Sequence, residues 1–295
     1  MKIYFEYNVE FLKRGNWMKL VMTLLVRDEE DIIGENIEFH ILQGVDFFLV
    51  MDNNSIDNTK NILKKYEESG ILKYYYKDDD VFNQEEWVTF MSREAFSLYG
   101  ADWIINNDAD EFWFPKYHKS LKNVFEGLGK NKNLLVAERS NFVPLEDETD
   151  SRFYSSMVYK ETFSVNDNGK RLSPKVAYKA SLEISVSHGN HGIESGLKKI
   201  LPVSDLIEIL HFPIRNKRQY ERKIINLGLG LLQNKKHSNN IRATLYKKFK
   251  EDNTYLENKY YSESYSYKDI LTCLEEGSLI KDTRLRDKLE DIFKS

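Results

Sequence analysis

The chain of 295 residues is long enough for one large domain with appendages or for two modest domains. Hydrophobic residues make up 41% of it and charged residues 31%, a balance typical of a globular protein with a sizeable core. The 43 basic and 47 acidic side chains give a net charge of -4, so no broad positive field indicates a nucleic-acid partner. Cys273 is the single cysteine, which excludes an intramolecular disulfide and a thiolate zinc cluster.

The N-terminal segment and the absence of long apolar runs bear on location. No run of apolar residues approaches the length of a membrane span, and charges are scattered through the first 17 residues. Apolar and polar residues alternate from Ile3 to Phe11, as in an edge strand, although Met18 is an equal candidate for the natural start. We expect a cytoplasmic protein, with peripheral membrane association left open, and an N-terminal extension or edge strand at residues 1–18.

Strand-like and helix-like patterns alternate through the first part of the chain. Short apolar runs predict strands at residues 20–26, 45–51, 71–76 and 102–106. Amphipathic segments between these runs predict helices, the first with Asp28 as its N-cap and Gly44 at its end. This alternation predicts an α/β protein with a parallel, doubly wound sheet and right-handed crossovers.

The later part of the chain is less regular. A helix is expected at residues 121–128 and a strand at residues 134–139, followed by shorter strands and loops up to His191. Beyond Arg215 the pattern becomes helical and highly charged. We therefore predict one domain at residues 19–214 and a helical C-terminal region at residues 215–295.

Three loops after predicted strands are rich in carboxylates or amides, and they read RDEED, DNNSIDNT and NDADEF. Doubly wound sheets bind ligands beyond the carboxyl ends of their strands, which is where these loops lie. Asp108 and Asp110 follow a strand with one residue between them, so their carboxylates point to the same side. Two hard oxygen ligands suit Mg²⁺ or Mn²⁺, either of which would neutralise a diphosphate. The alternative is a capped, solvated loop.

The segments VRDEED, VMDNNSIDNT and ADWIINNDADEF resemble successive signatures of the family 2-like glycosyltransferases with the GT-A fold. The resemblance covers residues 20–114 well, and it continues more weakly through GNHGI and ILHFPIRNKRQYERKI, which resemble a bacterial subgroup. It implies a GT-A type fold, a nucleotide-diphosphate sugar donor and a divalent metal. For the acceptor it implies a glycan or lipid-linked hydroxyl, as in polysaccharide biosynthesis.

The resemblance also implies roles for individual residues. Carried over position by position, it suggests Arg27 and Glu29 near the nucleoside, Asp52 on the base, Arg93 near the diphosphate, and Asp108 with Asp110 at the ribose and metal. A carboxylate on the base favours a uridine nucleotide. This chain departs from the family at residues 52–55, where D-N-N-S stands in place of the frequent D-D-G-S. Turn chemistry is the alternative for Asp52, and a surface ion pair is the alternative for Arg93.

Two histidines are candidates for the site. A late histidine is a plausible third protein ligand of the metal, and chemistry alone leaves the choice open. His211 ends the apolar run at residues 206–210, so it would occupy a strand end as Asp108 does, and we predict it as the ligand. The affinity of the site for Mn²⁺ should then decrease as the pH drops below about 6.5. His191 lies between glycines, and if the reaction inverts the anomeric centre it is the first candidate for the base.

The predicted function is metal-dependent transfer of a sugar from a nucleotide donor to an acceptor hydroxyl. A sugar nucleotidyltransferase is one competing class, but it should have a glycine-rich loop where this chain has VRDEED. A non-catalytic calcium or sugar-binding module is another, since carboxylate loops alone would permit it. The spacing of an EF-hand fails, because the sixth position of DADEFW is not glycine.

Overall fold

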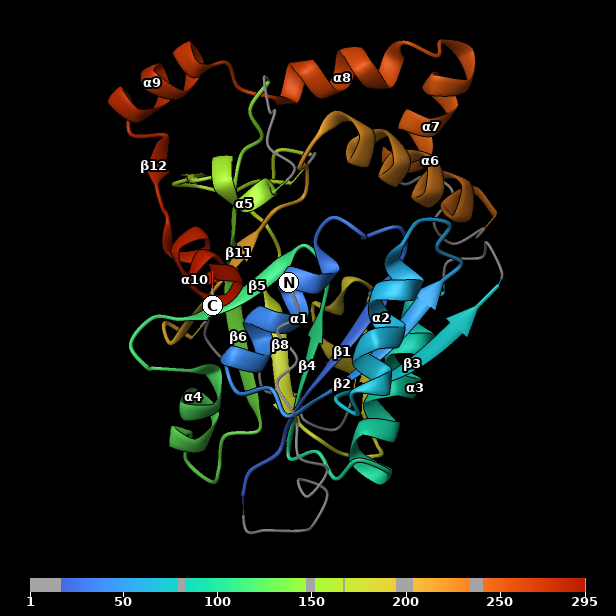
Figure 1. Ribbon diagram of the computed structural model, residues 1–295, viewed down its shortest axis with the longest axis vertical. Coiled ribbons are helices and arrows are strands. Elements are labelled where there is room, and N and C mark those ends of the chain that lie inside the picture. Colours follow the sequence, from blue (N-terminus) through green and yellow to red (C-terminus); the bar gives the residue numbers. More distant parts are fainter. Residues whose placement is uncertain are drawn as a thin grey trace.

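The computed structural model describes residues 17–78, 83–146, 152–166, 168–194, 204–233 and 241–294. The extension or edge strand predicted at residues 1–18 lies almost wholly outside these ranges. Figure 1 shows a central twisted sheet flanked by helices, with a further group of helices across its upper end.

The main sheet is built from eight strands of the described ranges. They are β1 (Leu20–Val26), β2 (Phe47–Asn53), β3 (Leu72–Lys77), β4 (Trp103–Asn107), β5 (Glu111–Pro115), β6 (Leu134–Asn141), β8 (Lys175–Lys179) and β11 (Ile207–His211). Their order across the sheet is β3-β2-β1-β4-β8-β6-β11-β5. The strands β1 to β4 are parallel, as are β6 and β11, whereas β8 and β5 run antiparallel to their neighbours. The predicted α/β class with a mostly parallel sheet is confirmed.

Both faces of the sheet are covered, which explains why β1 is a continuous apolar run. Successive side chains of a strand point to opposite faces, so Leu20 and Met22 enter one core cluster while Val21 enters another. The second cluster includes Trp87 and Met91 of α3 (Gln84–Ser97). Burying each such side chain stabilises the fold by roughly 1.5–3 kcal/mol.

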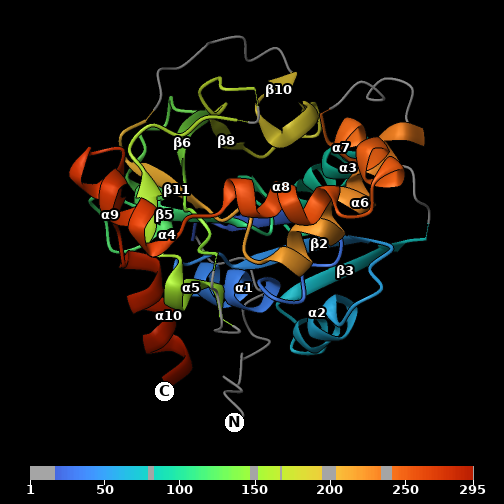
Figure 2. The same cartoon turned by 90° about the horizontal axis from the view of Figure 1, so that it is seen from above.

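The helices of the first half follow the predicted pattern. They are α1 (Ile33–Leu42), α2 (Thr59–Glu68), α3 and α4 (Leu121–Gly127). Seen from above, α1 and α2 lie on one face of the sheet and α3 on the other (Figure 2). Gly44 ends α1 as expected: its φ is 85°, and a Cβ there would lie 2.7 Å from Cβ of Lys122.

The predicted N-cap of α1 is wrong. The helix begins at Ile33 after Ile32, which makes no side-chain cap. Asp28 lies four residues earlier with a φ of 54°, and its carboxylate accepts a hydrogen bond of 2.7 Å from the backbone N–H of Ile56. Asp28 therefore joins the loop after β1 to the loop after β2, a contact between distant segments that helix-capping patterns do not reveal.

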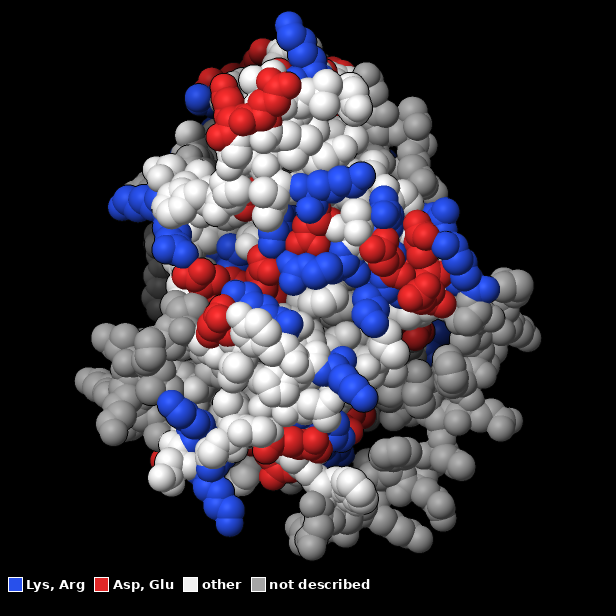
Figure 3. Space-filling model, turned by 90° about the vertical axis from the view of Figure 1, so that its left-hand side faces the viewer, with Lys and Arg blue, Asp and Glu red and all other residues white. Residues whose placement is uncertain are grey.

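The C-terminal region is mainly helical and returns to the sheet. Its elements are α6 (Lys217–Gln233), α7 (Ile241–Glu251), α8 (Tyr255–Glu263), α9 (Tyr267–Glu275), β12 (Leu279–Lys281) and α10 (Arg284–Lys294). The strand β12 pairs with β7 (Tyr159–Glu161), and α10 contacts α1 and α5 (Phe153–Ser156). None of the described helices combines the length and apolar character that crossing a membrane requires. Acidic and basic side chains are intermingled on the described part of the face shown in Figure 3.

Two strands of the sheet were not predicted individually. The strand β8 falls in the segment where only short strands and loops were expected, and β5 follows directly after the D-A-D sequence. The chain reverses at this sequence, and β5 pairs antiparallel with β11, with Glu111 opposite His211. This pairing brings the two predicted metal-binding segments to the same edge of the sheet.

Candidate active site

Asp108 and Asp110 lie in the turn between β4 and β5, at the carboxyl end of a central strand. The turn is closed by a hydrogen bond of 3.1 Å from the N–H of Glu111 to the carbonyl of Asp108. Asp110 is buried, with 4% of its surface exposed, whereas the side chain of Asp108 is 34% exposed. The D-A-D sequence therefore sits where a doubly wound sheet binds ligands.

Buried amides hold this turn in place. Asn36 of α1 donates from its side-chain amide to the carbonyls of Ala109 and Glu111, at 2.9 and 2.8 Å. Asn107 donates to the same Glu111 carbonyl at 3.0 Å and accepts from Nε1 of Trp113 at 2.9 Å. Each bond satisfies a buried polar group, so together they specify the course of the backbone at the turn.

His40 completes this buried network. Its Nε2 accepts from the N–H of Trp113 at 3.2 Å, so Nδ1 carries the hydrogen and donates to the carbonyl of Asn36 at 2.8 Å. Burial lowers the pKa of His40 to about 3, which keeps the ring neutral. Sequence reasoning missed this network. The sequence feature that could have indicated it is the spacing of Asn36 and His40, which are four residues apart and lie on the same buried face of α1 as Ile37.

His211 faces Asp110 across the sheet edge. The backbone N–H of Phe212 donates to the carbonyl of Asp110 at 2.8 Å, and Nε2 of His211 lies 3.7 Å from Oδ1 of Asp110. Burial holds the pKa of His211 well below its ordinary value, so the ring is neutral at pH 7. The expected loss of metal affinity on acidification therefore moves to a lower pH than 6.5.

Asn141, at the end of β6, fixes the tautomer of His211. Its amide nitrogen donates to Glu161 at 3.1 Å and to the carbonyl of Val165 at 3.2 Å, so its oxygen is the atom 2.7 Å from Nδ1 of His211. An oxygen accepts, and Nδ1 therefore carries the hydrogen. The lone pair of His211 is left on Nε2, the nitrogen that faces Asp110.

A buried lysine neutralises the other aspartate. Nζ of Lys175 lies 2.5 Å from Asp108 and 3.4 Å from Glu111, and Lys175 has no exposed surface. Glu111 also pairs with Arg139 at 3.1 Å. Burial raises the pKa of Glu111 to about 7, although Lys175 and Arg139 act in the opposite direction. The second carboxylate oxygen of Glu111 is buried without a hydrogen-bond partner among the described residues.

The loop that carries His191 reaches the same turn. Asn190 donates to Asp108 at 3.1 Å, and its own amide oxygen is buried without a partner in the described part of the chain. The carbonyl of Pro174 lies 2.9 Å from Nδ1 of His191 and can only accept, so the lone pair of His191 is on Nε2. Burial and the nearby Lys175 lower the pKa of His191 to about 4.

Cationic side chains from the C-terminal region cover the carboxylate loops. Lys223 of α6 lies 2.5 Å from Asp110, and Arg222 lies 2.9 Å from Asp57 in the loop after β2. Arg215, just before α6, is fully buried and contacts Glu29 and Asp31 after β1. Sequence reasoning described this region only as helical and charged, because periodicity shows which face of a helix a charge occupies but not which distant carboxylate it meets.

Glu29 lies in that first loop, as expected for a nucleoside contact. Its carboxylate accepts from Arg215 at 2.6 Å, and its backbone N–H donates to the hydroxyl of Thr59 at 2.9 Å. Burial raises the pKa of Glu29 to about 7 even though Arg215 opposes the shift. Arg27 lies one residue beyond β1 and is partly buried. Both residues are at the edge where the D-A-D turn lies.

Asp52 lies at the correct strand end but faces the protein. One carboxylate oxygen accepts from the backbone N–H of Ser55 at 2.9 Å, and the other accepts from the hydroxyl of Tyr74 at 2.8 Å. Asp52 has no exposed surface. These are the contacts of the turn alternative, and a base contact requires that Tyr74 or the loop move.

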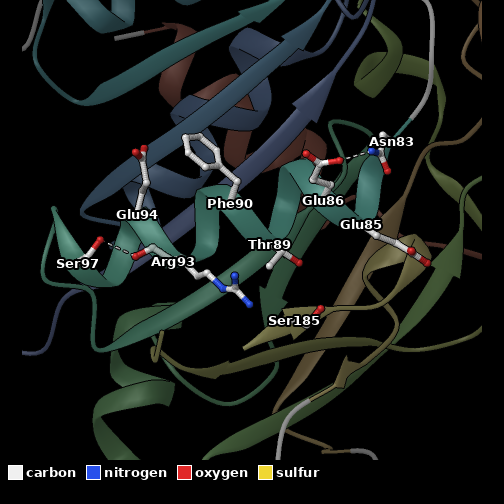
Figure 4. Close-up of a pocket in the computed structure, with 9 residues that line it drawn as sticks. All are labelled: Asn83, Glu85, Glu86, Thr89, Phe90, Arg93, Glu94, Ser97 and Ser185. Atoms are coloured by element: carbon white, nitrogen blue, oxygen red, sulfur yellow. Dashed lines mark hydrogen bonds between the residues drawn. The ribbon is translucent and has the colours of Figure 1, made fainter. Parts of the chain in front are cut away.

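Arg93 lies apart from these residues. Its Nε donates to the carbonyl of Ile184 at 3.1 Å, and it lines a hollow of about 510 Å³ together with Glu94 and Ser185 (Figure 4). Gln84, at the start of α3, reaches the His191 loop through the N–H of Gly189 at 3.0 Å. The contact with Ile184 places the side chain of Arg93 in this hollow rather than in the D-A-D turn.

The remaining predicted site residues converge. Asp108, Asp110, Glu29 and His211 lie around one edge of the sheet, and the His191 loop joins them through Asn190. Among the described residues, no group of three or more His, Cys, Asp or Glu side chains is arranged to hold a metal ion. Asp110 and the lone pair of His211 nevertheless form a pair of ligand types that suits Mn²⁺ or Mg²⁺, with the remaining ligands left to a diphosphate and water.

Comparison with known families classifies the chain as a glycosyltransferase. The sequence model of glycosyltransferase family 92 matches residues 22–264, which is most of the chain, and the chain therefore belongs to that family. The predicted enzyme class is confirmed at this level. The narrower likeness to the family 2-like enzymes stays a prediction, and neither competing class gains support from this assignment.

Individual relatives are distant. The chain is 35% identical over 80 residues to the uncharacterized glycosyltransferase MG060 homolog of Mycoplasma pneumoniae, a match that covers 26% of this chain and 25% of that protein. Residues 1–349 of S. aureus TarS, solved in complex with UDP, are similar at 16% identity and a TM-score of 0.40, with 73% of this chain and 66% of that fragment covered. Glucosyl-3-phosphoglycerate synthase of Mycobacterium tuberculosis, solved with Mn²⁺ and uridine diphosphate, has 15% identity and a TM-score of 0.29, with 41% and 44% covered.

Proposed function

We propose that this chain transfers a sugar from a nucleotide-diphosphate donor, with a uridine nucleotide expected, to a glycan or lipid-linked hydroxyl. The observation that carries the proposal is the pairing of Asp110 with the unprotonated Nε2 of His211 at 3.7 Å, on the sheet edge where doubly wound proteins bind ligands. Glu111 and Asn190 each have a buried oxygen with no hydrogen-bond partner among the described residues, which supports a site that binds a cation or a hydroxyl donor.

In this proposal Asp110 and His211 hold Mn²⁺ or Mg²⁺, and Asp108 holds the ribose or the metal. When bound, such an ion neutralises the negative charge that develops on a departing diphosphate. Lys175 forms an ion pair of 2.5 Å with Asp108 and adds positive charge to the site. Arg27 and Glu29 are the proposed nucleoside neighbours, since both lie in or next to the loop after β1.

His191 is the proposed base for the acceptor hydroxyl. Its Nδ1 is anchored on the carbonyl of Pro174, which leaves the lone pair on Nε2 to accept a proton. A pKa of about 4 makes the ring a weak base, and the second cause of that low value is the charge of Lys175. A bound diphosphate would offset this charge and raise the pKa of His191, which would make it a stronger base in the complex.

We also propose that the domain at residues 19–214 and the region at residues 215–295 form one functional unit. Arg215, Arg222 and Lys223 contact carboxylates of three loops of the first domain, which supports a shared site. A cytoplasmic location, peripheral membrane association and a role in polysaccharide biosynthesis remain predictions from the sequence.

Calorimetric titration with nucleoside diphosphates tests this proposal. The wild-type protein should bind uridine diphosphate in the presence of Mn²⁺, and EDTA should weaken that binding. Guanosine diphosphate is the comparison for the base. Absence of heat with every nucleoside diphosphate, with and without Mn²⁺, would contradict the proposed function.

A further inference from the structure

The ammonium of Lys223 contacts one of the two carboxylate oxygens of Asp110, to which a metal would bind. Its Nζ lies 2.5 Å from Oδ2 of Asp110, while Nε2 of His211 faces the other oxygen of the same carboxylate. A second contact, of 3.4 Å, joins the ammonium to the carbonyl of Pro213.

The helix that carries Lys223 lies across the carboxyl ends of the strands (Figure 1). Arg222 pairs with Asp57 in the loop after β2, and Asn226 donates to Asp28 in the loop after β1. Three neighbouring positions of α6 thus reach the loops after β1, β2 and β4. This places cationic side chains over the edge where a diphosphate would bind.

A divalent ion and the ammonium of Lys223 compete for Asp110. Two cations a few ångströms apart on one carboxylate repel each other. A metal on Asp110 and His211 would therefore displace the ammonium. A nucleotide-bound metal brings an anionic diphosphate with it, and that diphosphate offers the displaced ammonium new acceptor oxygens.

The two lysines of the site differ in their freedom to move. Lys175 has no exposed surface and touches two carboxylates, Asp108 and Glu111. The side chain of Lys223 is 17% exposed and, within the described part of the chain, contacts one carboxylate. Because lysine is a point charge on a flexible four-carbon stem, Lys223 can change partner without movement of α6.

We propose that Lys223 is a diphosphate-binding residue whose ammonium holds Asp110 until metal and donor arrive, and then moves to a diphosphate oxygen. This inference rests on the proposed function of the same site. In the alternative, the Lys223 ion pair only fastens α6 to the D-A-D turn. The two roles differ in what removal of the ammonium does to metal binding and to nucleotide binding.

Lys223→Met tests the inference, because it removes the charge and keeps most of the side chain's length. Mn²⁺ alone should bind about 10-fold more tightly, since its competitor at Asp110 is gone. Uridine diphosphate, measured with saturating Mn²⁺, should bind about 10- to 100-fold more weakly, because a charge-assisted hydrogen bond to the diphosphate is lost. Thermal unfolding confirms that the variant is folded.

Lys217→Met is the matched control. Lys217 belongs to the same helix and also makes an ion pair, of 2.7 Å to Glu257, but away from the D-A-D turn. Both affinities should stay at their wild-type values in this variant. Opposite changes in the Lys223 variant alone support the inference, since a merely fastening role gives no loss of nucleotide affinity once Mn²⁺ is saturating.

The inference is overturned if Lys223→Met fails to raise the affinity for Mn²⁺ or fails to lower the affinity for uridine diphosphate. If the wild-type protein binds Mn²⁺ and the nucleotide normally, that result leaves the proposed function intact. If the wild-type protein binds neither, the proposed function itself is overturned.

Discussion

The side-chain oxygen of Asn141 lies 2.7 Å from Nδ1 of His211, and this bond decides which nitrogen of the imidazole faces Asp110. Asn141 is held by its own donations to Glu161 and Val165, so its orientation does not depend on His211. Asn141 of β6 thereby sets the tautomer of His211, the candidate metal ligand in β11. A histidine can bind a metal only through an unprotonated nitrogen, which makes this contact a condition for the proposed site.

Asn141→Ala should therefore lower Mn²⁺ affinity by about 10- to 100-fold while His211 is still present. Without the acceptor at Nδ1, the ring is free to carry its hydrogen on Nε2 and to rotate. Isothermal titration with Mn²⁺ in the presence of uridine diphosphate measures the effect. Asn61→Ala, on the exposed surface of α2, is the control and should bind as the wild type does. Wild-type affinity in the Asn141 variant would show that the tautomer is irrelevant.

His40 should make stability depend on pH. Its folded-state pKa is lowered to about 3, whereas an unfolded histidine titrates near 6.5, so the unfolded chain binds a proton that the folded chain does not. The contribution of the neutral ring to the free energy of unfolding is therefore fully present above pH 6.5. It falls by about 1.4 kcal/mol for each pH unit below that value.

Denaturant unfolding between pH 7.5 and 4.5 measures this slope. His40→Gln should be less stable at pH 7.5, because the bond from Trp113 to Nε2 is lost or weakened, but its stability should fall less steeply on acidification. The difference in slope should correspond to about one proton. Equal slopes in the variant and the wild type would mean that His40 is protonated inside the fold.

Asp52→Ala should weaken the binding of uridine diphosphate and of guanosine diphosphate to the same extent. The carboxylate is fully buried and stabilises the loop after β2 through Ser55 and Tyr74, so its loss should loosen the whole loop. Tyr74→Phe removes one of these bonds and keeps the carboxylate, and it should give a smaller loss of the same kind. Competition binding of the two nucleotides measures both variants. A loss confined to uridine diphosphate would instead support the base contact suggested by the resemblance.

Much of the fold could be predicted because its central strands are buried on both faces. The first four predicted strands lie within two residues of β1, β2, β3 and β4. A sequence in which continuous apolar runs alternate with amphipathic helices is compatible with few folds other than a parallel sheet covered by helices. The strand β5 was missed because it follows the D-A-D turn so closely that its apolar residues could equally belong to a loop leaving the site.

The site could be predicted only in part. Asp108 and Asp110 follow a strand directly, so their location depends on local sequence and sheet topology alone. The contacts of Lys223 with Asp110 and of Arg215 with Glu29 join residues 113 and 186 positions apart. Ion pairs between such distant segments are set by tertiary packing, and no periodicity in either segment specifies the partner.

Release of nucleoside diphosphate from a panel of nucleotide sugars tests the central claim most directly, with wild-type protein, Asp110→Ala and the exposed control Asp205→Ala compared with Mn²⁺ and with EDTA. The wild type and the control should release uridine diphosphate from at least one uridine-diphosphate sugar in Mn²⁺ and far less in EDTA. Asp110→Ala should lose on the order of 100-fold or more of this activity while remaining folded. Full turnover by Asp110→Ala in the presence of EDTA, or no release from any nucleotide sugar by the wild type, would contradict the account.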